Sequence, residues 1–392
     1  MIDELIKTGC IKVGNFKLKN GDFSKYYFDM KNLVSYPELL STIGDEIYNR
    51  FIKDKINVGE NNYILCGIPL GGLPISIYIS TKYNIPMIIP RLEKKKYGTQ
   101  KVIEGTYKKT DRCLIIEDVI TTGSSVRSVI ELLKDKVNII GVISIIDRQQ
   151  GYSVKSGFIC NIPVKSLLTK TDIVRYRLES IVNSKKSRLC FSADHSNTDY
   201  LLKMLDEIGK YIVICKIHYD IMNDIDENIK KKLVELSIKH DFLIMQDSKF
   251  VDISHIVIKQ YSIYKNWIDM VTVHGSINSK VVEKLSGVLL VANMSNNVWD
   301  FTDKVIDIAL HNTRNVIGFI TQKRIRSTEV EKIMLSGTKM WCMTPGISLS
   351  KKVDEDQKYR CADDVDTDII IVGRGIYLSN NYIDDVKKFS SI

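Results

Sequence analysis

Short, continuous apolar runs recur along the second half of the chain, and a helix-length polar stretch separates each run from the next. Such runs, without polar alternation, are typical of strands buried on both faces of a parallel sheet. Eight strand–helix repeats in about 200 residues predict a (β/α)8 TIM barrel. The eight predicted strands are Leu189–Ala193, Tyr211–Cys215, Phe242–Met245, Met270–Val273, Val288–Ala292, Val316–Ile320, Met340–Met343 and Ile369–Val372.

The first half also alternates apolar runs with helix-length stretches, after a less regular start. We expect an amphipathic segment over Ile2–Ile11, a strand pair around Gly14–Lys19 and Tyr26–Asp29 with a turn at Asn20-Gly21, and a helix over Tyr36–Lys53. Further runs predict a parallel sheet covered on both faces: Tyr63–Cys66, Pro86–Pro90, Cys113–Ile116 and Val137–Ile146. The predicted fold class is therefore α/β, with a parallel-sheet domain followed by a barrel.

At 392 residues the chain is too long for one ordinary domain. The stretch from Gly151 to Ser187 is mixed and lysine-rich, and we expect a helix over Thr169–Val182 and a hinge over Asn183–Ser187. We therefore predict a first domain over residues 1–168, a join over 169–187 and a barrel over 188–392.

Charged residues follow two neighbouring strands of the predicted barrel. Asp247 and Lys249 are two residues apart, so in extended chain they point the same way, and Asp252 follows them. Lys216 ends the preceding apolar strand. Because strand-end charges converge at the carboxyl face of a barrel, these residues predict a site for charge chemistry. The alternative is a solvated loop with a chance ion pair.

Lys216 together with Asp247-Ser-Lys-Phe-Val-Asp252 resembles the charged tetrad of the orotidine 5′-phosphate decarboxylase family. The resemblance implies that Lys216, Asp247, Lys249 and Asp252 are catalytic and that no cofactor takes part. It also implies a homodimer, because Asp252 reaches into the neighbouring subunit's site. Two residues depart from the family: Gln246 stands where glutamate is frequent, and Ile256 replaces a threonine that contacts ribose.

Gly373-Arg-Gly375 follows the last predicted strand, where barrel enzymes bind phosphate through backbone N–H groups, and Arg374 adds a planar fork for phosphate oxygens. The same resemblance assigns Ser192 and Asp194 to the pyrimidine and ribose, and Ser295 to the loop over the pyrimidine. The expected binding residues for orotidine 5′-phosphate are Ser192, Asp194, Ser295, Pro345, Gln357, Tyr359, Gly373 and Arg374.

In the first half, a buried strand ends in two acids, Glu117 and Asp118, and a loop of small hydroxyl residues leads from it into a helix. Backbone N–H groups at a helix N-terminus form a phosphate cradle with such hydroxyls. The acids suit ribose hydroxyls or a magnesium ion. A capping serine after an ordinary strand is the alternative for Ser124 alone. The cradle residues are Thr121, Thr122, Gly123, Ser124 and Ser125.

This string resembles the phosphoribosyl-diphosphate (PRPP) motif of type I phosphoribosyltransferases, and its surroundings resemble orotate phosphoribosyltransferase. The resemblance implies a mobile loop beginning at Arg91 with Lys95 as catalytic lysine, substrate contacts from Lys19 and Arg148, and magnesium carried with PRPP. Leu92 stands where that family usually has lysine. Magnesium and lysines suit the reaction because pyrophosphate leaves as positive charge develops on the ribose.

Composition changes this interpretation little. With 44% hydrophobic and 26% charged residues, no apolar run of membrane-span length and no signal segment, we expect a cytoplasmic protein without a membrane partner.

The chain has a net charge of +9 but lacks the arginine-rich or aromatic-interleaved stretches of nucleic-acid binders, so we expect small-molecule anions as partners. The eight cysteines are scattered without a Cys-x-x-Cys pair, which favours reduced thiols. The six histidines lack metal-site spacing.

The order of the two halves resembles the bifunctional uridine 5′-monophosphate (UMP) synthase family. This implies that the first domain makes orotidine 5′-phosphate (OMP) from orotate and PRPP, and that the barrel decarboxylates it to UMP. Two alternatives stay open from the sequence. One half is inactive because of Leu92 or Ile256, or the fold serves as a nucleotide-sensing regulator.

Overall fold

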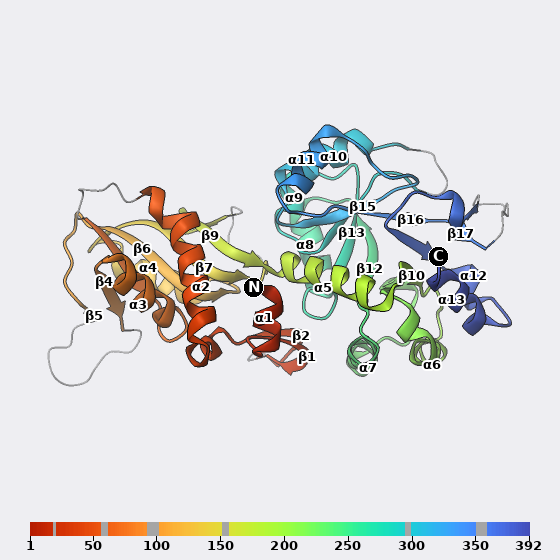
Figure 1. Cartoon of the computed structure of the whole chain (residues 1–392), viewed down its shortest axis with the longest axis horizontal. Helices are drawn as coiled ribbons and strands as arrows, with labels where there is room; N and C mark the ends of the chain where they lie inside the picture. Colours follow the sequence, from red (N-terminus) through yellow and green to blue (C-terminus); the bar gives the residue numbers. More distant parts are fainter. Residues whose placement is uncertain (19–20, 56–61, 92–101, 151–156, 295–298, 350–358) are drawn as a thin grey trace. The chain divides into compact units, whose positions relative to one another are not determined.

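The computed structural model describes residues 1–18, 21–55, 62–91, 102–150, 157–294, 299–349 and 359–392 (Figure 1). The chain forms two compact units. The first contains Met1–Lys12 and Phe28–Lys170, and the second contains Val13–Tyr27 and Thr171–Ile392. Within the described residues, no helix is long and apolar enough to cross a membrane.

The first unit is built on a seven-stranded sheet in the order β5-β4-β3-β6-β7-β9-β8. Strands β3, β4, β6, β7 and β9 are parallel, and the two-residue strands β5 and β8 add antiparallel edges. Helix α2 packs on α3, α3 on β3 and β6, and α4 on β6 and β7. The elements are β3 (Tyr63–Gly67), β4 (Met87–Pro90), β5 (Ile103–Glu104), β6 (Arg112–Ile120), β7 (Asn138–Asp147), β8 (Phe158–Ile159), β9 (Ile162–Thr169), α1 (Ile2–Lys7), α2 (Pro37–Ile47), α3 (Gly72–Tyr83) and α4 (Ser124–Leu133).

Strand β9 was not predicted, and its surroundings explain why. It pairs with β7 along one side and with only the short β8 on the other, so its first residues alternate between intermediate and exposed. Pro163 and Lys165 therefore interrupt the apolar pattern without breaking the strand. Its buried Ser166 shares a hydrogen bond of 2.7 Å with Ser144 of β7, which satisfies both hydroxyls.

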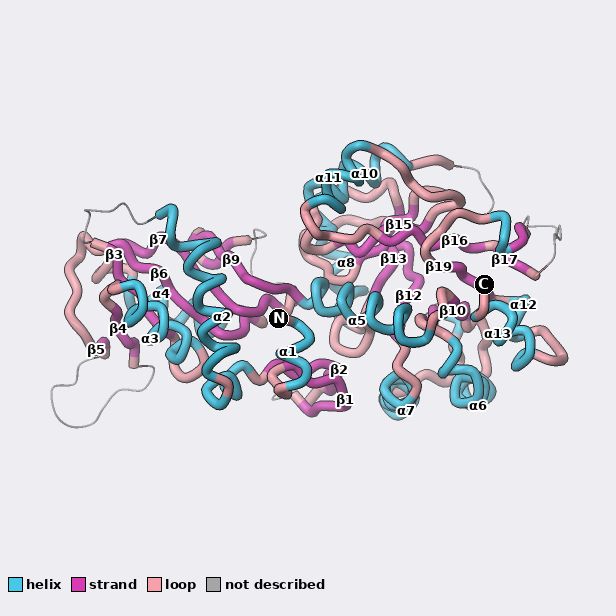
Figure 2. The backbone as a smooth tube through the Cα atoms, viewed as in Figure 1, coloured by secondary structure: helices cyan, strands magenta, loops and turns pink. Residues whose placement is uncertain are grey.

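The second unit contains a closed barrel of eight parallel strands, which confirms the predicted TIM barrel. Figure 2 shows its strands inside a layer of helices. The strands are β10 (Leu189–Ser192), β11 (Ile214–Ile217), β12 (Leu243–Phe250), β13 (Met270–His274), β14 (Val288–Val291), β15 (Val316–Ile320), β16 (Trp341–Pro345) and β19 (Ile369–Val372).

The barrel helices follow the strands in alternation. They are α6 (Thr198–Ile208), α7 (Glu227–Lys239), α8 (Ser254–Ser262), α9 (Ser279–Val282), α10 (Thr302–His311), α11 (Thr328–Leu335), α12 (Arg374–Tyr377) and α13 (Tyr382–Ser390). A short parallel pair, β17 (Ile347–Ser348) and β18 (Arg360–Cys361), follows β16. Strand β11 begins later than expected because a 3-10 turn, Gly209–Tyr211, precedes it.

Helix α5 (Lys170–Lys185) covers the amino-terminal end of the barrel. Arg175 donates hydrogen bonds to the carbonyls of Thr313 (3.0 Å) and Val316 (2.7 Å) at the start of β15. Lys185 donates to three carbonyls ahead of β11 and β12, those of Gly209, Ile212 and His240. The helix therefore extends into the segment 183–187 that the sequence suggested as a hinge. The domain limits 1–168, 169–187 and 188–392 stay a prediction.

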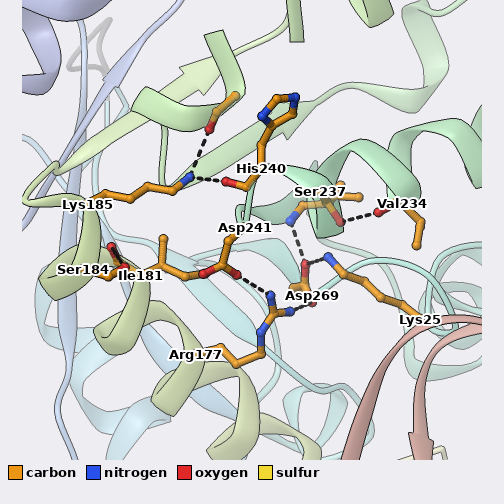
Figure 3. Close-up of polar contacts among 12 residues, drawn as sticks. Lys25, Arg177, Ile181, Ser184, Lys185, Val234, Ser237, His240, Asp241 and Asp269 are labelled. Carbon is orange, nitrogen blue, oxygen red and sulfur yellow. Dashed lines mark hydrogen bonds and ion pairs between the residues drawn. The ribbon is translucent and has the colours of Figure 1, made fainter. Parts of the chain in front are cut away.

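The β1–β2 hairpin (Ile11–Lys17 and Phe23–Phe28) contributes two buried polar side chains to the second unit. Lys25 Nζ lies 2.6 Å from Asp269 Oδ2, with both side chains fully buried (Figure 3), and the Tyr26 hydroxyl donates to Asp269 Oδ1 over 2.5 Å. Arg177 of α5 completes the cluster by donating to the Tyr26 hydroxyl and to Asp241, each over 3.0 Å. A lysine at position 25 reads from sequence as an ordinary surface residue, so this cluster was not predicted.

Candidate active sites

The predicted lysines and acid of the barrel meet at the carboxyl ends of β11 and β12. Lys216 Nζ lies 2.8 Å from Asp247 Oδ2, and Lys249 Nζ lies 2.8 Å from Asp247 Oδ1. One carboxylate therefore holds two ammonium groups, one on each oxygen. Lys216 is buried, whereas Lys249 is 37% exposed at its side chain and faces the cavity. This arrangement presents one accessible positive charge next to a fixed negative one.

Asp247 and Lys249 point the same way, but not because the strand is regular. The pairing of β12 with β13 shifts between Gln246 and Phe250, and Lys249 has a left-handed φ of 46°. A bulge of this kind re-aims side chains that a regular pleat would direct elsewhere. Buried Gln246 uses both ends of its amide here: Oε1 accepts from the Tyr219 N–H, and Nε2 donates to the Ser248 hydroxyl, each over 3.0 Å. A glutamate at this position would lack that amide donor.

His218 joins this site although it was not predicted. Its Nδ1 lies 2.8 Å from Asp194 Oδ1, and its Nε2 lies 3.3 Å from Asp247 Oδ2. Ser192 donates a hydrogen bond to the other Asp194 oxygen over 2.8 Å. The signal that could have found His218 is its position two residues beyond Lys216, which brings it back to the same side of the extended chain.

Charge balance sets the protonation of these groups. Burial opposes ionisation of Asp247, but Lys216, His218 and Lys249 hold the pKa of its carboxyl well below the usual value. Burial likewise opposes the charge on Lys216, yet Asp247 and Asp194 raise the pKa of its ammonium. Asp194, despite its burial, has a pKa lowered to about 2 by His218, Lys216 and Ser192. All three groups are therefore charged at neutral pH.

A cavity of about 270 Å³ opens at this end of the barrel. The predicted residues that line it are Ser192, Asp194, Lys216, Asp247, Lys249, Pro345, Tyr359, Gly373 and Arg374. The Arg374 guanidinium carbon lies 5.5 Å from the centre of the Tyr359 ring. A Cβ at Gly373 would lie 3.3 Å from the Ser192 side chain, so glycine keeps this wall close. Ser295 and Gln357 lie outside the described residues.

Asp252 is not among the described residues that line the cavity. Its side chain is exposed and accepts a hydrogen bond from the Ile253 N–H over 2.6 Å. Its neighbours Val251 and Ile253 are 59% and 69% exposed, unusually high for aliphatic side chains. The structure therefore brings together three members of the predicted tetrad and leaves the fourth on the surface.

In the first unit, β6 delivers Glu117 and Asp118 to the point where α3 begins. A Cβ on Gly71 would lie 2.0 Å from Asp118 Oδ2, and one on Gly72 would lie 2.3 Å from the Ile116 carbonyl. The two glycines therefore let the start of α3 approach the acids closely. Residues Thr121–Gly123 lead from β6 into α4, and Gly123 has a φ of 72° that suits glycine. The predicted loop into a helix is confirmed.

Both acids hold their proton more tightly than a free carboxyl group does. Burial, with a smaller contribution from Asp118, raises the pKa of Glu117 to about 8. Burial also raises the pKa of Asp118. Lys31 opposes both shifts. The raised pKa values indicate that the positive charge around these two adjacent acids is too small to stabilise both carboxylates. Among the described residues, no group of three or more histidine, cysteine, aspartate or glutamate side chains forms a metal cluster.

Arg148 follows β7, and its backbone N–H donates to the Ile120 carbonyl over 2.9 Å. This bond ties it to the end of the strand that carries the acids. Its guanidinium carbon lies 5.5 Å from the Phe28 ring centre, and burial lowers its pKa. Arg91 Nε donates to Glu104 over 2.6 Å. Lys19, Leu92 and Lys95 lie outside the described residues.

Comparison with known proteins agrees with this geometry. Residues 187–389 match the orotidine 5′-phosphate decarboxylase / HUMPS family, and residues 38–174 match the phosphoribosyl transferase domain. The chain is 31% identical to the uridine 5′-monophosphate synthase of Bos taurus over an alignment of 469 positions, which covers 99% of this chain and 95% of that protein. This chain belongs to the UMP synthase family.

Two further relatives support the assignment. The UMP synthase of Caenorhabditis elegans is 28% identical over 100% of this chain and 94% of its own length. The orotidine 5′-phosphate decarboxylase of Candida dubliniensis is 36% identical over 53% of this chain and 85% of its own length. The predicted family and fold class are confirmed, as is the bifunctional assignment of orotate phosphoribosyl transfer followed by OMP decarboxylation. The comparisons do not favour a regulatory protein or a half-active UMP synthase.

Proposed function

We propose that this chain performs both reactions of a UMP synthase with the residues assigned above. The first unit transfers phosphoribose from PRPP to orotate, and the barrel removes CO2 from the resulting OMP to give UMP. The observation that supports this best is the carboxylate of Asp247 between two lysine ammonium groups at the cavity of a TIM barrel.

For the decarboxylation, Lys249 is the residue that meets the reacting carbon. Loss of CO2 leaves negative charge on C6 of the pyrimidine, and an ammonium next to that carbon stabilises the charge and delivers a proton. Asp247 and Lys216 fix this ammonium in place before the substrate arrives, so no reorganisation is needed during the reaction. The tetrad needs no cofactor for this step.

The rest of the cavity divides by chemistry. Arg374, Tyr359 and Gly373 suit the phosphate, because a guanidinium offers a planar fork of donors to phosphate oxygens. Asp194 and His218 suit the ribose hydroxyls. Ser192, Pro345 and, from outside the described residues, Ser295 and Gln357 complete the proposed binding set.

The active barrel is proposed to be a homodimer. Asp252, the remaining tetrad member, is exposed and stands between two exposed aliphatic residues, Val251 and Ile253. An exposed apolar pair next to a charge needed for chemistry is expected where a second subunit covers the surface. In this arrangement Asp252 serves the partner's cavity, and Ile256 reduces ribose contact there without abolishing activity.

For the transfer reaction, the β6–α4 loop holds PRPP. Residues Thr121–Ser125 offer backbone N–H groups and hydroxyls to its phosphate, and Arg148 holds the orotate carboxylate. Lys95, Lys19 and Arg91 are proposed to act on the pyrophosphate and orotate. Glu117 and Asp118 fit magnesium, since their buried carboxylates call for positive charge and magnesium prefers oxygen ligands. Bound magnesium would neutralise the departing pyrophosphate.

The setting of the protein is proposed to be the cytoplasm, with orotate, PRPP and OMP as its small-molecule partners. All eight cysteines are free thiols, and six of them are buried. Free thiols in these numbers are usual where glutathione and thioredoxin keep proteins reduced.

A two-stage assay tests the proposal. Purified protein receives orotate, PRPP and magnesium, and both OMP and UMP are measured over time. UMP as the end product supports both sites. Accumulation of OMP would refute the barrel assignment. Ile256→Thr, which restores the family's residue, would then be the first variant to test. Failure to consume orotate would refute the first site, and OMP supplied directly would then test the barrel alone.

A further inference from the structure

Thr272 of β13 lies on the strand next to β12, directly beside the bulge that carries the two charged residues of β12. Gln246 pairs with Val271 and Phe250 with Val273, so β12 fits its bulged residues opposite the single residue Thr272. Thr272 is 1% exposed, so its hydroxyl needs partners inside the barrel.

Both partners of this hydroxyl come from the bulge. Thr272 Oγ1 lies 2.7 Å from Asp247 Oδ1, and the Lys249 N–H donates to Thr272 Oγ1 over 2.9 Å. An amide N–H only donates, so the hydroxyl accepts from Lys249 and directs its own proton to the carboxylate. The same Asp247 oxygen also holds the Lys249 ammonium at 2.8 Å. Asp247, Lys249 and Thr272 therefore form a closed ring of hydrogen bonds.

The ring matters because of the backbone that it holds. Lys249 has a φ of 46°, a left-handed conformation that a side chain larger than glycine adopts rarely. Such conformations persist where surrounding contacts enforce them, and they cluster at functional sites. The hydrogen bond from the Lys249 N–H to Thr272 is a contact of this kind. Without it, a β12 backbone free to relax would move the ammonium away from its position in the cavity.

We propose that the Thr272 hydroxyl is a positioning residue for decarboxylation, which fixes the Asp247 carboxylate and the Lys249 backbone in one arrangement. It does not line the cavity and acts through these two residues. The inference rests on the proposed roles of Asp247 and Lys249.

Thr272→Val keeps the shape of the side chain and removes its hydroxyl. We expect kcat for OMP decarboxylation to fall by about 10- to 100-fold, because small displacements of reacting groups have effects of this size, while KM for OMP changes less than about threefold. The acid limb of the kcat/KM profile should move to higher pH, since Asp247 loses a hydrogen-bond donor that favours its charged form. Thr272→Ser keeps the hydroxyl and should restore kcat to within about threefold of the unmodified chain.

Thr367→Val is the matched control. Thr367 precedes β19 and is buried, and its hydroxyl donates to the Cys342 carbonyl over 2.8 Å. This variant loses a buried hydroxyl from the same barrel, away from the cavity, and should keep kcat and the pH profile. The urea unfolding transition of each variant reports that its barrel has folded.

Three results would overturn the inference: an unchanged kcat in Thr272→Val, an equal loss in Thr272→Ser, or an equal loss in Thr367→Val. Lys249→Ala, measured in parallel, separates this failure from that of the proposed function. If Lys249→Ala is inactive while Thr272→Val is fully active, only the positioning role is wrong. If Lys249→Ala retains decarboxylation, the site assignment itself is wrong.

Discussion

Nδ1 of His218 lies 2.8 Å from Oδ1 of Asp194, and its other ring nitrogen faces Asp247. An imidazole between two carboxylates is favoured in its protonated form. Burial works against this charge, but the two acids prevail and raise the pKa of His218 above its usual value. His218 therefore acts as a third cation of the barrel site, next to Lys216 and Lys249.

His218 should make barrel stability depend on pH. Its pKa is higher in the folded than in the unfolded chain, so its stabilising contribution is complete below about pH 6.5 and is lost as pH rises through the folded-state pKa. The stability gap between the unmodified chain and His218→Gln should thus narrow from pH 5.5 to pH 9 in urea unfolding. His311→Gln, which removes an exposed histidine, is the matched control. A gap that widens with pH would contradict the assignment.

Lys249→Ala should abolish decarboxylation and spare OMP formation. Lys249 lies in the barrel cavity and takes part only in the proposed second reaction. Its loss removes both charge stabilisation and the proton donor, so the rate of decarboxylation should fall by at least about 10³-fold. Quantifying OMP and UMP from the same reaction measures both steps. Lys95→Ala should give the reverse result. Equal loss of both activities in either folded variant would contradict the two-site assignment.

The periodicity and charge of the sequence predict the barrel strands and the charged residues of the site. Features that depend on tertiary packing could not be predicted in this way. The barrel strands were visible because each is a continuous apolar run, and Asp247 and Lys249 stood out as charges at the end of one. The bulge that aims Lys249 was not visible, because it depends on register with β13. Thr272 looked like an ordinary strand residue for the same reason.

The helix α5 and the buried Lys25 show the same limit at the opposite end of the barrel. The contact of α5 with the barrel cannot be seen in the sequence, because its polar residues bind backbone carbonyls that precede strands distant in the chain. Lys25 is separated from Asp269 by 244 residues, and no local pattern reports such a pair. Lys19, Lys95, Ser295 and Gln357 stay predictions from family resemblance.

Lys25→Met should destabilise the chain strongly. The change leaves Asp269 charged inside the barrel unit with one ammonium fewer, and removal of one partner of a buried pair costs about 3–5 kcal/mol. Arg177 and Tyr26 still contact Asp269, so the lower end of that range is expected. Lys239→Met breaks an exposed pair with Asp206 and should cost less than about 1 kcal/mol. Equal unfolding midpoints for the two variants in urea would argue against a stabilising role for the cluster.

The affinity of the first unit for magnesium and PRPP should increase with pH. Glu117 has a pKa raised to about 8, so it is largely protonated at pH 7 and must lose its proton to hold a cation. We expect the apparent Kd for PRPP with magnesium to fall as pH rises from 6.5 to 8.5. Glu117→Gln should bind more weakly and show a flatter profile, whereas Glu131→Gln, on the exposed side of α4, should behave as the unmodified chain.

The raised pKa of Glu117 has the opposite effect on the stability of the folded chain, which falls as pH rises. The folded state binds the Glu117 proton more tightly than the unfolded state, so between about pH 4.5 and pH 8 the contribution of Glu117 to stability declines as pH rises. Magnesium with PRPP should therefore raise the unfolding temperature more at pH 8.5 than at pH 6.5. An equal rise at both values would show that Glu117 does not take part in binding.

Asp252 allows the proposed dimer to be tested by mixing two inactive variants. Lys249→Ala lacks the reacting lysine, and Asp252→Asn lacks the acid that each subunit gives to its partner. A mixed dimer then contains one cavity with both changes and one with neither. Random association makes half of the dimers mixed, so about one quarter of the cavities should be intact.

Co-expression of the two variants with different tags, followed by purification through both, should enrich the mixed dimer and give about half the decarboxylase activity of the unmodified chain. Lys216→Ala mixed with Lys249→Ala is the matched control, because both lysines lie in the cavity of their own subunit, and neither subunit of a mixed dimer has both of them intact. There each cavity keeps one defect and activity should stay absent. Activity only in the first mixture requires that Asp252 act across a subunit boundary, whereas an inactive mixed dimer would show that Asp252 acts in the cavity of its own subunit.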